Sequence, residues 1–282
     1  MQFTEEDLAS FMEKEKEKRR NIDGRQLLRQ VREDAVVVGK LLDGVVLAPG
    51  GVAEALDAPF ATANTFLPST MTRTMLRLAV YYVRAADDKG EIALSSFVVL
   101  RAAIECIASA HWLMSGGSRR ENTERTLKRM WWDTMAAADM ATTADGNPDI
   151  SATYPLRQLI TVIAQPIKGL DPESIFASKR ESLSGIVRKA SAALRPDDGS
   201  AFYAAWMACA AVSHGNIPVS AGAGVAPELI QNPSMHLIDN PVYASMASVA
   251  VADLRETVEL FARRAAEMHT HQGHNSASSA PA

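Results

Sequence analysis

Apolar residues recur at helical spacing along most of this chain. Within residues 25–47, for example, Leu27, Leu28, Val31, Ala35 and Val38 recur at the spacing typical of one helix face. The same periodicity predicts further helices over residues 72–87, 91–114, 118–142, 154–165, 171–194, 200–214 and 241–268. We expect the 171–194 segment to break near Ser178 or Gly185. No long alternating pattern typical of strands occurs, although a small β-hairpin within 216–240 stays open.

Two long irregular segments interrupt the helices. Residues 48–70 carry three prolines and a Gly-Gly pair, so we expect a loop there with at most one helical turn. Residues 216–240 are similarly rich in proline and glycine. The sequence therefore predicts an all-α, single-domain bundle of about seven to nine helices with two long irregular loops. Long loops within a compact domain are often functional.

The ends of the chain differ in composition from its middle. Residues 1–24 are highly charged and predict a polar helix over 4–20 that serves as an N-terminal arm. Residues 25–269 form the predicted helical domain. Residues 270–282 have the composition of a disordered tail.

Local signals fix two helix starts. Ser118 and Glu121 have the spacing of a capping box, in which each side chain bonds the backbone of the other. Asp171 followed by Pro172 predicts an N-cap with proline in the first helical position. The 91–114 helix is apolar nearly all round, which predicts a central position in the bundle.

Composition narrows the class of protein. The 282 residues carry a net charge of −4, which does not indicate a strongly basic nucleic-acid-binding domain. Cys106 and Cys209 match no metal-ligand spacing, so we expect reduced, buried thiols, no metal site and no cofactor. The N-terminus lacks an apolar leader, and the longest uninterrupted apolar run, residues 201–212, is shorter than a membrane span. We expect a cytoplasmic protein that does not contact membranes.

Several polar residues interrupt apolar helices and are the candidate site. Arg101 and Glu105 lie one turn apart in the 91–114 helix, where a charged pair is costly unless its members bond each other. His214 ends the 200–214 helix. Catalytic roles are predicted for His214, Arg101 and Glu105, and ligand-binding roles for Arg125, Arg129, Ser213 and Tyr203. A purely structural explanation stays open, because an ion pair can serve packing and His-Gly suits a helix end.

The sequences RAAIECIASAHWL and FYAAWMACAAVSHG, at 101–113 and 202–215, resemble a group of uncharacterised bacterial all-helical proteins. They are more distantly similar to the HEPN superfamily of helical domains. HEPN-like relatives that cleave RNA use an arginine and a histidine separated by four to six residues, near a dimer interface. Here that motif would be Arg263 or Arg264 with His269, since His214 has no arginine at that spacing. The resemblance implies a homodimer and an RNA or nucleotide ligand.

Two functions remain open from the sequence. In the first, the protein is a non-catalytic module with a buried Arg/Glu/His cluster, and it binds either a partner or an anionic ligand. Arginine would then grip phosphate, and Glu105 would orient Arg101. In the second, the protein is a HEPN-like nuclease that acts on RNA in a toxin or phage-defence system.

Overall fold

A computed structural model describes residues 23–85, 92–145, 153–197, 201–216 and 240–267 of the chain, with side chains undescribed for 141–145. These residues form helices and connecting turns, without a β-strand. The helices are α2 (Gly24–Asp43), α3 (Val52–Thr62), α4 (Pro68–Ala85), α5 (Leu94–Met114), α6 (Arg119–Asp145), α7 (Thr153–Ala164), α8 (Pro172–Phe176), α9 (Leu183–Leu194), α10 (Ala201–Ser213) and α13 (Pro241–Ala266). The all-α prediction is confirmed.

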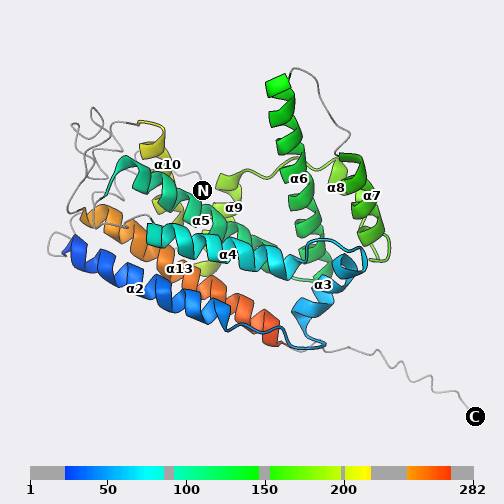
Figure 1. Cartoon of the computed structure of the whole chain (residues 1–282), viewed down its shortest axis with the longest axis horizontal. Coiled ribbons are helices and arrows are strands. Elements are labelled where there is room, and N and C mark those ends of the chain that lie inside the picture. The colour runs from blue at the N-terminus through cyan, green and yellow to red at the C-terminus, as the bar shows by residue number, and fades with distance from the viewer. Residues whose placement is uncertain (1–22, 86–91, 146–152, 198–200, 217–239, 268–282) are drawn as a thin grey trace, which may run out of the picture.

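Helix α5 is the centre of the bundle, as its composition predicts. It packs against α4, α13, α9 and α10, and α2 covers α4 and α13 from the other side (Figure 1). By length and composition, α5 is long and apolar enough to cross a membrane. A search of the sequence for uninterrupted apolar runs does not find it, because Arg101 and Glu105 interrupt the run. Two-thirds of its most apolar window is buried inside the protein, and the core helix of a soluble protein meets the same criterion.

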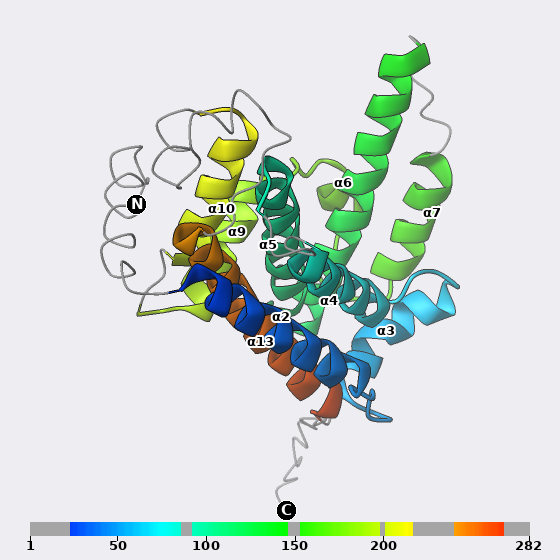
Figure 2. The same ribbon diagram turned by 60° about the vertical axis from the view of Figure 1, so that its left-hand side comes forward.

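Helix α6 leaves the bundle at a steep angle. In Figure 1 it stands across the direction of α4 and α5, and both views show α7 beside it (Figures 1 and 2). Helix α8 also packs against α6. The short connection between α5 and α6 therefore does not make them antiparallel neighbours. The steep angle matters because it carries most of α6 away from α5.

Three local expectations need correction. Residues 52–62 form a full helix, α3, where the sequence suggested a single turn, and Pro59 is tolerated inside it. The Ser118 hydroxyl accepts from the Glu121 amide at 3.1 Å, but the Glu121 carboxylate accepts from the Gly117 amide at 2.8 Å, so the capping box is displaced by one residue. The extra helix and the break between α8 and α9 bring the described helices to ten.

Other helix signals are confirmed. The Asp171 carboxylate caps α8 by accepting from the amides of Glu173 and Ser174 at 3.1 and 3.2 Å. The buried residues of α2 follow the predicted stripe, from Leu28 to Leu42. The predicted 4–20 helix, the tail from 270 and nearly all of the 216–240 segment lie outside the described residues.

Candidate functional site

Arg101 and Glu105 bond each other on one face of α5. The Nε of Arg101 donates to Oε1 of Glu105 at 2.9 Å, as expected for residues one helical turn apart. Their side chains are 25% and 22% exposed, so neither is fully desolvated. This ion pair uses only one edge of the guanidinium and leaves its two terminal nitrogens for other partners.

His214, at the end of α10, supplies the next contact. Its Nε2 lies 3.3 Å from Nη1 of Arg101, across 113 residues of sequence. A guanidinium only donates hydrogen bonds, so Nε2 must accept and the proton of the neutral ring must sit on Nδ1. Protonation of both ring nitrogens would remove this acceptor. The last turn of α10 holds the backbone of His214, whose amide bonds the carbonyl of Ala210 at 3.0 Å.

Trp206 completes the cluster and is the residue that the sequence analysis did not assign. Its indole N–H donates to Oε1 of Glu105 at 3.0 Å, and the guanidinium carbon of Arg101 lies 5.5 Å from its ring centroid. Tyr203 stacks on Trp206 with ring centroids 5.9 Å apart. The signal was present, because positions 203 and 206 share a helix face, but the indole contact to another helix could not be foreseen.

The cluster lies at the surface of the bundle. His214 is exposed, and Tyr203 and Trp206 are half-buried. The prediction of a buried cluster in an interior pocket is therefore wrong in its burial, although the convergence of Arg101, Glu105 and His214 is observed. The reason is that the core-facing stripe of α5 is formed by residues such as Leu100, Ile104 and Ala108. Arg101 and Glu105 lie beside that stripe.

The predicted ligand-binding arginines lie elsewhere. Arg125 donates to the carbonyl of Trp112 at 2.7 Å, to the hydroxyl of Ser115 at 3.1 Å and to Glu121. It therefore closes the turn between α5 and α6 and also covers the Trp112 ring, at 5.5 Å. Because α6 departs steeply, Arg125 does not join the Arg101 cluster, contrary to its predicted ligand-binding role there.

Arg129 and Ser213 are also committed to local contacts. Arg129 donates to Asp133 at 2.7 Å and to the Ser109 hydroxyl at 3.4 Å, without a bond to Glu105 in the described part of the chain. The Ser213 hydroxyl donates to the carbonyl of Cys209 at 2.6 Å, one turn back in its own helix. Of the four predicted ligand-binding residues, Tyr203 alone adjoins the cluster.

The two thiols next to the cluster are poor nucleophiles. Burial, reinforced by the negative charge of Glu105, raises the pKa of Cys106 to about 11, and Arg129 opposes the rise. Burial raises the pKa of Cys209 still further, against the positive charge of Arg101. Both cysteines are free of disulfides, and the thiolate is the reactive form, so neither is prepared for covalent chemistry at neutral pH.

The arrangement is suited to holding an anion. Arg101 is fixed by an ion pair, an imidazole and an aromatic face, while its Nη2 has no bond to any described residue. The His214 Nδ1–H lies on the exposed ring beside it. Two fixed donors next to a half-exposed aromatic pair match a phosphate group attached to a planar group. The described residues contain no group of three or more metal-ligating side chains.

Comparison with known proteins adds no relative. No protein-family model matches the chain, and neither a curated protein nor a solved structure matches it significantly. The resemblance to HEPN domains stays a prediction. Of its motif, Arg264 pairs with Glu267 at 3.3 Å, Arg263 is exposed, and His269 lies outside the described residues.

Proposed function

We propose that this protein is a cytoplasmic, non-catalytic module that binds a phosphate-bearing planar ligand of the nucleotide class. The observation that carries the proposal is the Arg101 guanidinium, which three side chains fix while Nη2 stays unbonded within the described residues. An arginine held in this way loses little side-chain freedom when it binds a phosphate, so more of the interaction appears as affinity.

The chemistry of His214 favours binding over catalysis. A general base needs an available lone pair, and the only lone pair of the neutral imidazole, at Nε2, already accepts from Arg101. The remaining Nδ1–H donates, which suits a phosphate oxygen. Catalysis by this histidine would require it to give up the contact that orders the site.

The aromatic pair accounts for the planar part of the ligand. Tyr203 and Trp206 are half-buried and stacked with their ring planes inclined by 17°, so a planar group that extends this stack lies near Arg101. Stacking of a base on an aromatic side chain contributes about 1–3 kcal/mol. We therefore expect a nucleoside monophosphate to bind better than either of its halves.

Calorimetric titration tests this function directly. The full-length protein is titrated with adenosine monophosphate, adenosine and inorganic phosphate. We expect the nucleotide to bind at least about tenfold more tightly than phosphate or nucleoside alone, because both contacts are then made together. Arg101→Gln should weaken nucleotide binding by about tenfold or more, since a charged hydrogen bond is lost.

Arg77→Gln is the matched control, because Arg77 lies on α4 in an exposed ion pair with Asp43. Its nucleotide affinity should equal that of the natural sequence. Equal losses in the two variants would show that only general charge is sensed, and would refute the site. Cleavage of single-stranded RNA that disappears in His214→Ala would refute the non-catalytic function and favour the HEPN-like nuclease.

A further inference from the structure

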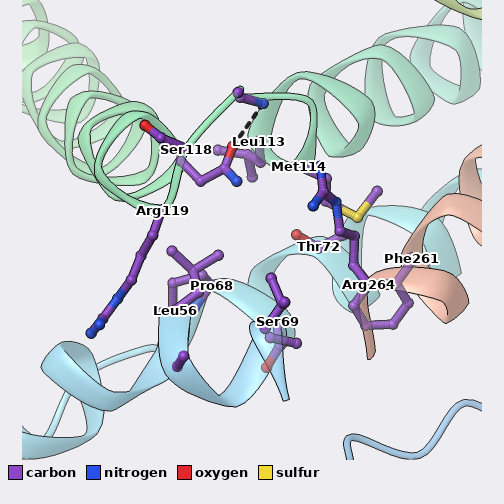
Figure 3. Close-up of a pocket in the computed structure, with 16 residues that line it drawn as sticks. Leu56, Pro68, Ser69, Thr72, Leu113, Met114, Ser118, Arg119, Phe261 and Arg264 are labelled. Atoms are coloured by element: carbon purple, nitrogen blue, oxygen red, sulfur yellow. Dashed lines mark hydrogen bonds between the residues drawn. The ribbon is translucent and has the colours of Figure 1, made fainter. Parts of the chain in front are cut away.

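A mainly apolar cavity lies at the C-terminal end of α5, about 20 Å from Arg101 along the helix. Its volume is about 220 Å³, and it is enclosed by α3, α4, α13 and the junction between α5 and α6 (Figure 3). Most of its wall is hydrocarbon, contributed by Val52, Ala53, Leu56, Leu113, Met114 and Phe261. None of these residues belongs to the Arg101 cluster.

One polar side chain in this cavity lacks a partner. Thr72 is 3% exposed and lines the cavity, yet its hydroxyl bonds no described residue. Figure 3 shows the side chain of Thr72 facing the cavity from α4. Five other helical threonines donate to the carbonyl four residues back, namely Thr62, Thr123, Thr126, Thr161 and Thr257. Because this hydroxyl borders the cavity and is not sealed inside the protein, it is available to donate to a ligand there.

A positive charge stands beside that hydroxyl. Arg264 also lines the cavity, and its side chain runs from α13 past Thr72 toward the end of α5 (Figure 3). Its Nη1 lies 3.3 Å from Oε2 of Glu267, in a pair whose side chains are 35% and 53% exposed. An exposed pair of this kind is weak, so Arg264 can still attract an anion.

Ser69, Ser118 and Asn122 also line the cavity, and each has a hydrogen bond within the fold. The buried Asp57 carboxylate accepts from the amide of Ser69 at 2.9 Å and from its hydroxyl. Burial is the main cause that raises the pKa of Asp57. The Oδ1 of Asn122 accepts from the Gly116 amide at 2.7 Å, and its amide nitrogen bonds no described residue. The cavity therefore offers donors and two cations, of which Arg264 stands beside Thr72 and Arg119 extends away from it (Figure 3).

The volume sets the size of the ligand. A dry apolar cavity of about 150 Å³ holds benzene, so one of about 220 Å³ holds an apolar body of roughly nine heavy atoms. An acyl chain of about eight carbons, or a small aromatic ring with a short substituent, is of that size.

We infer that this cavity binds a medium-chain carboxylic acid, with its hydrocarbon chain against the apolar wall and its carboxylate bonded by Thr72 and Arg264. The hydroxyl of Thr72 donates to one carboxylate oxygen, and the guanidinium of Arg264 pairs with the head group. This site is separate from the proposed nucleotide site, and either can fail without the other.

Titration of the full-length protein with octanoate, octanol and acetate tests the inference without any substitution. Octanoate should bind saturably, with one molecule for each chain. Octanol should bind at least about tenfold more weakly because it lacks the charge, and acetate far more weakly because it lacks the apolar body. Absence of octanoate binding, or octanol binding as tight as octanoate, would overturn the inference.

A matched pair of substitutions on α13 locates the ligand. Arg264→Gln should weaken octanoate binding by about tenfold, whereas Arg263→Gln, at the exposed neighbouring position, should leave it unchanged. Thr72→Val keeps the shape of the side chain and should weaken binding by about fivefold or more. Equal effects of the two arginine substitutions, or no effect of Thr72→Val, would contradict this placement. Circular dichroism verifies the fold of each variant, and the Thr72 test stands even if an arginine variant unfolds.

Discussion

Replacement of His111 should make the protein more resistant to acid. His111 lies in the last turn of α5 and is 6% exposed. Burial, together with the positive charge of Arg125, lowers the pKa of His111 from 6.5 to about 4. As the pH falls, His111 therefore binds a proton near pH 6.5 in the unfolded chain but only near pH 4 in the folded protein. The free energy of unfolding thus decreases as the pH falls through this window.

The magnitude follows from the two pKa values. Their gap of about 2.5, at about 1.4 kcal/mol per pH unit, gives about 3 kcal/mol over the whole window. At about pH 5 roughly 2 kcal/mol of this is already lost relative to about pH 8. Asp57, whose pKa is raised, acts in the opposite sense, but it contributes equally to both proteins and cancels when they are compared.

Urea unfolding, followed by tryptophan fluorescence at about pH 8 and about pH 5, measures the effect. His111→Leu should lose about 2 kcal/mol less than the natural sequence between these conditions, whatever its stability at the higher pH. Met114→Leu, a change of similar volume in the same turn, should show the natural acid loss. The reasoning is refuted if His111→Leu and the natural sequence lose the same free energy on acidification.

Other substitutions test the packing. Arg195→Met should lower the free energy of unfolding by about 3–5 kcal/mol, because Arg195 bonds the fully buried Asp253 at 2.8 Å. A decrease of less than about 1 kcal/mol in urea unfolding, the value typical of a surface ion pair, would contradict this. Gly116→Ala should lower the free energy of unfolding by about 1–3 kcal/mol, since the new methyl group would collide with the first turn of α6. The new methyl group of Gly117→Ala would meet only one atom, at 3.7 Å, so this variant should melt at a higher temperature than Gly116→Ala. Thr72→Val, without ligand, should change the unfolding free energy by less than about 1 kcal/mol, because the hydroxyl that it removes bonds no described residue. A larger loss of stability would show that this hydroxyl is bonded within the fold.

The helices could be predicted because their signals are local. The apolar stripe of α2, the cap at Asp171 and the uniformly apolar composition of α5 each depend on residues within a few turns of one another. Residues 52–62 were harder, since Pro59 and the two glycines before the helix are typical of loops. Proline within a helix is normally costly, and packing against α4 and α13 offsets that cost here.

The candidate site could be predicted only in part. Charged residues within an apolar helix pointed to Arg101 and Glu105, and the helix end pointed to His214. Their contact depends on how α5 and α10 pack, and the exclusion of Arg125 depends on the steep departure of α6; neither is encoded in any short stretch. The residues that line the cavity around Thr72 come from four separate parts of the chain, so no local sequence pattern predicts it.

A double-mutant cycle measures most directly whether Arg101 and His214 form one anion site. Adenosine monophosphate is titrated calorimetrically into the natural sequence, Arg101→Gln, His214→Gln and the double variant. Side chains that act as a unit show coupling energies of about 0.5–3 kcal/mol, so the double variant should bind only slightly more weakly than the worse single variant. Additive losses, with a coupling energy near zero, would show that the two residues act separately and would contradict the proposed site.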